Sequence, residues 1–375
     1  MIWDPASLDP YRELWSEVFR VRPHQPSVSF EWTRALFHNH LGKNDRLVLV
    51  VLRDRERIQG IVPLVAESSR LFGLPMVTLA PLSERYNTHG DLLLSAASEN
   101  LVGALLDALF SFPYPWDMFR MSRLIEGSPL TACLEDQLRR GQTSFRSRSE
   151  TPSFVLPLPG SYDKYLARRS GKFRNFVRRA EKRLARLGRI EFLQTGVHLD
   201  LDAAYTALID IETRSWKHEH GTAISAIGRQ RNFYQELCRG MFESGRLHLT
   251  FLTLDGAPIA YNLGLVFDDT YYYLKTSFDE AFRAHSPATV VRSRLLALLI
   301  ESGISTFDFP GEPYEWEAQW TRDLQWHRSL LVFNRTMRGQ FYGMLRRLRD
   351  SRRKTPPEGV IAYVDPRDLK PPARQ

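Results

Sequence analysis

The segment 270–309, TYYYLKTSFDEAFRAHSPATVVRSRLLALLIESGISTFDF, decides the fold that the sequence predicts. Its first seven residues, TYYYLKT at 270–276, are rich in aromatic side chains, which is typical of a β-strand. The loop that follows ends at Ser286 and Pro287, residues that suit the cap and the first position of a helix. We therefore expect a helix to begin at Pro287.

This helix is predicted to run to about Ser302, because apolar side chains recur at helical spacing up to that point and Gly303 follows. Residues 304–309 form the next strand. A strand, a crossover helix and a second strand make a parallel βαβ unit, whose ligand lies at the carboxyl ends of the strands. There the N–H groups of residues 288–290 and the helix dipole would suit a pyrophosphate.

Two further strands are predicted before this unit, at 247–254 and 259–266, joined by the turn sequence DGAP. The first half of the chain shows the same order of a hairpin, a strand, a helix and a strand. This match is explained either by the ordinary recurrence of α/β patterns or by a true tandem of one fold. The predicted elements of the first half are a helix at 29–41, strands at 47–52, 58–65, 76–79 and 91–94, a helix at 99–110 and a strand at 116–122.

The composition fits a folded protein of two domains, because 375 residues with 43% hydrophobic side chains can build two cores. Only Cys133 and Cys238 occur, which argues against a disulfide framework and favours a reducing compartment. No apolar run approaches the roughly 20 residues of a membrane span, and the first residues do not form a signal peptide. We therefore expect a cytoplasmic protein.

The chain is basic, with a net charge of +8, and a helix predicted at 161–189 concentrates that charge. One face of this helix is apolar, and the other carries seven cations, Arg178 among them, relieved only by Glu181. The face is either solvated or binds phosphates, those of CoA or of a phosphorylated or lipid-linked acceptor. RNA binding is the weaker interpretation, because Phe173 and Phe176 are spaced for a core.

A polar cluster, WKHEHG at 216–221, ends a helix predicted at 201–216. His218 and His220 are two residues apart, a spacing that brings both rings together only on a strand, and no third ligand is near. We therefore predict no metal site. Trp216 and Lys217 are either substrate-binding residues or a buried tryptophan beside a surface lysine.

Four strings, SWKHEHGTAI, LDGAPIA, SFDEAFRAHSPA and FDFPGEPYEWEAQWT, together with the order of elements, resemble the GNAT superfamily of acyl-CoA N-acyltransferases. The resemblance covers roughly 155–335. It is greatest to the branch of cellulose-biosynthesis-type (CelD/BcsL-like) acetyltransferases, which is similar to the Fem-type peptidyltransferases. This chain departs from that branch at Ala288, where a glycine is usual, and at Glu315, where a lysine is usual.

The resemblance implies an α/β fold of tandem GNAT-like domains, with mixed sheets flanked by helices. The expected domains are an N-terminal scaffold or substrate domain at 1–150, an acyltransferase domain at 151–335, and a basic helix with a loose proline-rich tail at 336–375. Acyl-CoA is the implied co-substrate. Its expected binding residues are Tyr273, Lys275, Ser286, Ala288, Thr289, Val290 and Arg178. The substrate-binding candidates are Trp216, Lys217 and His285.

Acyl transfer to an amine needs a base for the amine, a donor to the oxyanion and an acid for the thiolate. Asp308 and Glu312 are the candidate bases, since they lie at the carboxyl end of the last strand of the βαβ unit. Tyr314 is the candidate acid, and a backbone N–H within 272–275 is the candidate oxyanion donor. Asp308 could equally pair with an arginine as a structural residue, and Tyr314 could simply pack under the loop.

The predicted function is transfer of an acyl group from acyl-CoA to an amine, such as that of an envelope sugar or polysaccharide precursor. The basic helix at 336–353 either docks on the second domain or contacts an anionic membrane face. Two alternatives stay open. One is a Fem-like transfer from aminoacyl-tRNA, the only case in which nucleic acid would be a partner, and the other is an inactive ligand-binding module.

Overall fold

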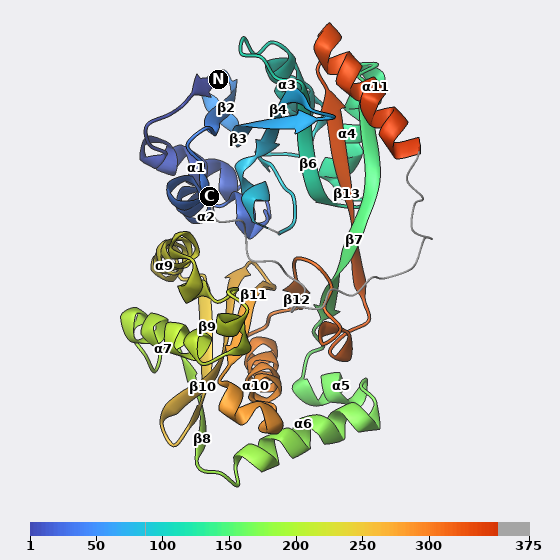
Figure 1. Cartoon of the computed structure of the whole chain (residues 1–375). Coiled ribbons are helices and arrows are strands. Elements are labelled where there is room, and N and C mark those ends of the chain that lie inside the picture. The colour runs from blue at the N-terminus through green and yellow to red at the C-terminus, as the bar shows by residue number, and fades with distance from the viewer. Residues whose placement is uncertain (87, 352–375) are drawn as a thin grey trace. The chain divides into compact units, whose positions relative to one another are not determined.

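The computed structural model describes residues 1–86 and 88–351 and divides into two compact units (Figure 1). Unit 1 comprises residues 1–153 together with 325–351, and unit 2 comprises residues 154–324. The first division lies next to the one predicted at 150/151, whereas the chain from Gln325 on belongs to unit 1. The proline-rich tail predicted after the last helix lies outside the described residues.

The sheet of unit 1 has the strand order β1-β2-β3-β4-β6-β13, with the short β5 beside β3. Its strands are β1 (Ile2–Trp3), β2 (Arg46–Asp54), β3 (Arg57–Leu71), β4 (Leu74–Pro81), β5 (Leu93–Leu94), β6 (Met118–Ile125) and β13 (Leu324–Phe333). Its helices are α1 (Arg12–Phe19), α2 (Phe30–His40), α3 (Glu99–Phe110), α4 (Pro129–Arg140) and α11 (Met337–Ser351), with 3-10 turns η1 (Asp9–Tyr11), η2 (Pro26–Val28) and η3 (Leu82–Arg85).

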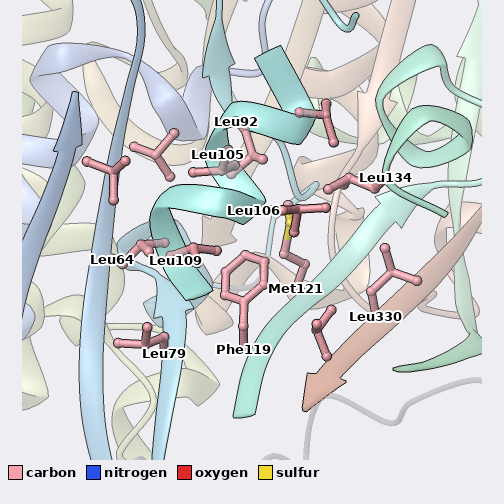
Figure 2. Close-up of a cluster of buried hydrophobic side chains, with 14 of the residues drawn as sticks. Leu64, Leu79, Leu92, Leu105, Leu106, Leu109, Phe119, Met121, Leu134 and Leu330 are labelled. Carbon is pink, nitrogen blue, oxygen red and sulfur yellow. The ribbon is translucent and has the colours of Figure 1, made fainter. Parts of the chain in front are cut away.

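The crossover helix α3 supplies much of the core of unit 1. It connects β4 to β6, and these two strands pair in parallel, as a crossover connection requires. Figure 2 shows Leu105, Leu106 and Leu109 of this helix gathered with Leu79 and Phe119 of the two strands. All five side chains are buried, so the apolar face of α3 holds the sheet in place.

Unit 2 has the strand order β7-β12-β11-β10-β9-β8. The strands are β7 (Phe145–Pro157), which begins in unit 1, β8 (Ile190–Gln194), β9 (Leu247–Leu254), β10 (Ala257–Phe267), β11 (Thr270–Phe278) and β12 (Thr306–Phe309). The helices are α5 (Tyr162–Ala167), α6 (Gly171–Leu184), α7 (Leu201–Thr213), α8 (Trp216–Glu219), α9 (Gly228–Glu243) and α10 (Pro287–Glu301), with 3-10 turns η4 (Ile224–Ala226), η5 (Glu280–His285) and η6 (Glu317–Gln319).

Helices cover both faces of the unit 2 sheet. Ala260 of β10 packs in one cluster with Val290 and Val291 of α10. The next residue, Tyr261, points to the other face and bonds to Glu212 of α7. Crossover helix α10 therefore lies on one side of the sheet and α7 on the other.

The two units repeat one order of elements. A hairpin, a third antiparallel strand, a crossover helix and a parallel strand follow one another as β2-β3-β4-α3-β6 in unit 1 and as β9-β10-β11-α10-β12 in unit 2. The predicted fold class, tandem α/β domains with mixed sheets flanked by helices, is confirmed.

Three local predictions are corrected. The basic segment 161–189 is two helices rather than one, because Ser170 starts α6 by accepting a hydrogen bond from Phe173 N at 3.2 Å. The segment 142–159, predicted as a linker with a short strand, contains the 13-residue strand β7. The helix expected to reach Trp216 ends at Thr213, and α8 follows it separately.

Gly264 of β10 makes a test of packing in unit 2. A Cβ at this position would overlap Cζ of Tyr271, whose ring is fully buried. We predict that Gly264→Ala lowers the free energy of unfolding by about 1–3 kcal/mol, as overpacking of a core does. Gly228→Ala is the control, because no atom lies within 4 Å of its added Cβ. Equal melting temperatures for the two variants would contradict this account.

Candidate active site

The pairing of the parallel strands β11 and β12 is short, because β12 ends at Phe309 while β11 runs on. They are paired only from Thr270 to Tyr272 on β11 and from Thr306 to Asp308 on β12. Strand β11 then continues to Phe278 without β12 as a partner. The place where this pairing stops, called the opening below, lies at the carboxyl end of β12, and open α/β sheets bind ligands at the carboxyl ends of their strands.

Strand β11 contains a bulge at this opening. Leu263 of β10 is opposite Lys275, and the next residue, Gly264, is opposite Tyr273, so Leu274 has no partner on β10. An extra residue leaves a local gap in the ladder and redirects the side chains that follow it. The bulge falls within 272–275, the stretch expected to supply an oxyanion donor.

The start of α10 differs from the prediction in one respect. Ser286 has a left-handed backbone with φ of 57° and makes no side-chain cap, so the predicted capping role of its hydroxyl is wrong. Its Oγ instead accepts a hydrogen bond from Arg183 Nη2 at 3.4 Å. The backbone oxygen of Ser286 accepts a hydrogen bond from Thr289 N at 3.0 Å. The N–H groups of residues 288–290 were expected to bind an anion, and that of Thr289 already has this partner.

The remaining residues expected to bind acyl-CoA lie in different surroundings. Ala288 is half-buried beside Ser286, whereas the side chain of Val290 belongs to the core. Tyr273 packs its ring against Phe309 and Trp316, so its side chain belongs to the core. Arg178 is exposed on α6.

Glu212 is the centre of a buried ionic cluster that joins Lys217 and Lys275. Its side chain is fully buried, and Oε1 accepts hydrogen bonds from Tyr261 Oη at 2.5 Å and Lys217 Nζ at 3.3 Å. Oε2 accepts from Ile224 N at 2.8 Å and lies 3.8 Å from Lys275 Nζ. The structure thus brings together Lys275, which was expected to bind acyl-CoA, and Lys217, which was expected to bind substrate.

The charges of this cluster are unequal, with two lysines for one carboxylate. Burial alone would raise the pKa of Glu212, but Lys217, Lys275 and Tyr261 outweigh it and lower that pKa to about 2. The pKa of Lys275 is lowered to about 8, mainly by burial. The negative charge of Glu212 opposes this shift, and the positive charge of Lys217 adds to it. Lys275 therefore holds its proton weakly for a lysine.

A buried guanidinium occupies an aromatic enclosure beside β11. Arg292 of α10 is 4% exposed, and its Cζ lies 4.0 Å from the ring centre of Trp316 and 5.4 Å from that of Trp320. Its Nε and Nη2 have no hydrogen-bond partner among the described residues. Stacking on aromatic faces stabilises this cation, and burial lowers the pKa of Arg292.

Glu317 is the buried acid of the loop after β12. Its Oε2 accepts a hydrogen bond from Tyr314 N at 3.0 Å. Burial raises the pKa of Glu317 to about 8 and nearby Asp308 adds to the effect, while Tyr314 N–H and Arg292 oppose it. Glu317 is therefore mostly protonated at neutral pH.

The three predicted catalytic residues lie in or at the end of β12 and in its following loop. Asp308 is buried at 5% exposure, whereas Glu312 is half-buried. Burial raises the pKa of Tyr314 to about 12, with Glu317 and Glu312 adding to the effect, so this hydroxyl is a weaker acid than the sequence suggested. Its ring stacks on Trp316 at 6.3 Å.

The other substrate-binding candidates lie near the turn η5. Trp216 N donates to Glu280 Oε1 at 3.3 Å, and its ring contacts that of His220. His285 is half-buried, and its Nδ1 has no hydrogen-bond partner within the described chain.

Sequence reasoning missed Arg292 and Glu317 as site residues. A signal for Glu317 was present, since this acid lies between two tryptophans in EWEAQW. A signal was also present for Glu212, since it lies on the same side of its helix as Tyr205 and Leu208, which is the side that faces the core. A carboxylate on that side is buried and needs a charged or hydrogen-bonding partner. For Arg292 the only signal was a cation within the apolar pattern of its helix.

Metal-binding groups and membrane-spanning helices are both absent from the described residues. No group of three or more histidine, cysteine, aspartate or glutamate side chains there could hold a metal ion. None of the helices in that part of the chain has the length and hydrophobicity needed to cross a membrane.

Residues 171–318 match the family model described as an acetyltransferase (GNAT) domain. This part of the chain is similar to GNAT acetyltransferase domains. The match contains strands β11 and β12, the start of α10 and the loop with Glu317. No curated protein sequence matches the chain significantly.

Two solved structures share the fold of the chain at low sequence identity. FemX is 12% identical with a TM-score of 0.60, and the match covers 92% of this chain and 99% of FemX. The C-terminal domain (DUF2156) of a protein from Agrobacterium fabrum named as a putative lysylphosphatidylglycerol synthetase is also 12% identical, with a TM-score of 0.56. That match covers 92% of this chain and 96% of the domain.

We predict that Glu317 makes stability depend on pH. Its pKa is about 8 in the folded chain and 4.5 in the reference state, so the folded chain retains a proton that the unfolded chain releases between these values. The resulting stabilisation is full below the lower value and is lost as pH rises through the higher one. Its loss amounts to at most about 1.4 kcal/mol per pH unit in that window.

The measurement is the free energy of unfolding of wild type and Glu317→Gln from about pH 5 to 9. The difference between the two proteins should change across this range, because the amide side chain of the variant cannot titrate. Parallel curves would show that Glu317 is not protonated in the folded chain at neutral pH.

Proposed function

We propose that the chain is an N-acyltransferase that moves an acyl group from acyl-CoA to an amine. The observation that carries the proposal is the opening between β11 and β12, bordered by the start of α10 and lying within the residues that match the GNAT family model. Ser286, Ala288 and Arg183 would hold the CoA phosphates at the helix start. The bulge at Leu274 would present a strand N–H to the thioester oxygen.

The proposed chemistry needs a carboxylate, a donor and an acid around this opening. The amine nitrogen attacks the thioester carbon, its proton passes to Asp308 directly or through Glu312, and the C–S bond breaks. Tyr314 gives its proton to the departing thiolate. Glu317, which is mostly protonated at neutral pH, leaves Asp308 without a second full negative charge beside it.

We propose an acceptor amine on an envelope sugar or polysaccharide precursor, in keeping with the resemblance to the CelD/BcsL-like branch, and a cytoplasmic location. A second candidate is Fem-like transfer from aminoacyl-tRNA. It is supported by the similarity of fold to FemX along nearly the whole chain and by the net charge of +8. Binding of CoA without turnover of any amine would instead support an inactive ligand-binding module.

Binding of CoA at the start of α10 is the first test. We predict that calorimetry detects one CoA site per chain and that Ala288→Trp abolishes it, because the indole would fill the space beside Ser286. Arg283→Ala is the control, since this exposed side chain of η5 pairs with Glu280 of the same turn. Undiminished binding by the tryptophan variant would remove the helix start as the CoA site.

The second test concerns the base. Asp308→Asn is predicted to lower turnover by about 10²- to 10⁴-fold, with a smaller effect on CoA affinity, because a general base acts in the chemical step. Its pH–rate profile should also lose the acidic limb. Glu315→Gln is the matched control, an exposed acid in the same loop. A lower melting temperature with normal turnover of the folded Asp308→Asn enzyme would make Asp308 a structural residue.

A further inference from the structure

A pocket of about 680 Å³ lies at the beginning of α6 and is lined by residues outside the site described above. One wall is the segment from Arg168 to Phe173, and the other is the end of the β12 loop from Ala318 to Asp323. The volume lies within the roughly 300–1,000 Å³ of small-molecule sites and is far larger than a single inorganic ion requires.

The pocket is strongly cationic. Four of its lining residues, Arg168, Arg169, Lys172 and Arg322, carry positive charge, and Asp323 carries the one negative charge. Arg169 is held in place, because its Nη1 donates to Trp320 O at 2.8 Å. The side chains of the other three cations form no hydrogen bond or ion pair within the described part of the chain. Their charge is therefore available to a ligand.

The floor of the pocket is aromatic. Phe173 and Phe176 line it, and Phe173 packs edge-on against Trp320 with ring centres 5.2 Å apart. Phe176 is half-buried and is not part of the core cluster that contains Phe173 and Val177. An apolar or planar group can thus be covered next to the cations.

The four cations of the pocket are balanced by only one acid among its lining residues, Asp323. The first turn of α6 contains no acidic residue, and Lys172 lies there against the positive end of the helix dipole. Such an arrangement is unfavourable without a counter-charge. A phosphate fits it well, since guanidinium groups bind phosphate oxygens in pairs and Lys172 supplies a point charge.

We propose that this pocket binds a phosphate ester that carries an apolar or planar body, with the phosphate among the cations and the body on Phe176. The pocket differs in its residues from the start of α10, because none of its lining residues belongs to α10 and Arg183, which bonds to Ser286, is not among them. Two sources share this chemistry, an anionic phospholipid headgroup and the 3′-phosphonucleotide half of CoA. Binding of either ligand to this pocket does not depend on the acyltransferase activity proposed above.

The test is calorimetry at low ionic strength with three probes: dihexanoylphosphatidylglycerol below its micellar concentration, adenosine 3′,5′-bisphosphate and inorganic phosphate. One of the two esters should bind with one site per chain and identify the source. Changing Arg168, Lys172 and Arg322 together to Ala should weaken that binding by about tenfold or more, since a single hydrogen bond to a charged group contributes about that factor. Phe176→Ala should weaken the ester and leave inorganic phosphate unchanged.

A matched control is present on the same helix. Arg179 and Lys182 are exposed toward its other end and Arg186 is exposed just beyond it, so their triple Ala variant removes the same charge from the protein. The affinity of this control variant for the ester should stay within about twofold of wild type. All six positions are exposed, so neither triple variant should disturb folding. Failure of both esters to bind wild type, or equal losses in the two triple variants, would overturn the proposal. Loss of CoA binding in Ala288→Trp with the ester retained would separate this site from the proposed acyl-CoA site.

Discussion

The buried carboxylate of Glu212 is the interaction on which the organisation of unit 2 depends. It links α7 to Tyr261 of β10, to Lys275 of β11 and to Lys217 of α8, and it fixes the following turn through Ile224 N. A buried charge without partners would cost several kcal/mol, so these segments must come together for the carboxylate to be tolerated. Lys217 adds a second constraint, since its Nζ also donates to the backbone oxygen of Thr276. The cluster therefore holds α8 against the part of β11 that pairs with β10 but not with β12.

The bulge at Leu274 is what allows this cluster to form. Tyr271 and Tyr273 enter the core beneath α10, and strict alternation along β11 would send Lys275 to the same side. The extra residue reverses the pattern, so Lys275 reaches the opposite face and meets Glu212. The bulge thus does two things at one place. It interrupts the pairing of β10 with β11, and it places Lys275, whose pKa is lowered, on the face of the sheet that carries Glu212.

The elements that could be predicted from the sequence were those with local causes. The hairpin of β9 and β10, the crossover through α10 and its beginning at Pro287 all follow from turn residues and apolar spacing within one segment. The meeting of Lys217 and Lys275 at one carboxylate could not be predicted, because it depends on a one-residue change of register that leaves no mark in the sequence pattern. The prediction that Ser286 caps α10 was wrong for a similar reason, since its left-handed backbone ends the turn η5 that precedes the helix. The strands and the helix around the candidate site were therefore predictable, whereas the pairing of the buried charges near it was not.

The two buried acids of unit 2 show how pairing divides their roles. Burial opposes the charged form of both Glu212 and Glu317, yet their pKa values are about 2 and about 8. Two lysines and a tyrosine reach the carboxylate of Glu212 directly, whereas the cation that acts on Glu317 is Arg292, whose guanidinium is stacked on Trp316. A charge that lies against a ring attracts the carboxylate without donating a hydrogen bond to it, so burial prevails at Glu317. Glu212 is accordingly a fixed anion that holds the fold, while Glu317 can exchange a proton near neutral pH beside Asp308 and Tyr314. Similar burial thus gives opposite charge states, because pairing keeps the carboxylate of Glu212 ionised and burial keeps the proton on Glu317.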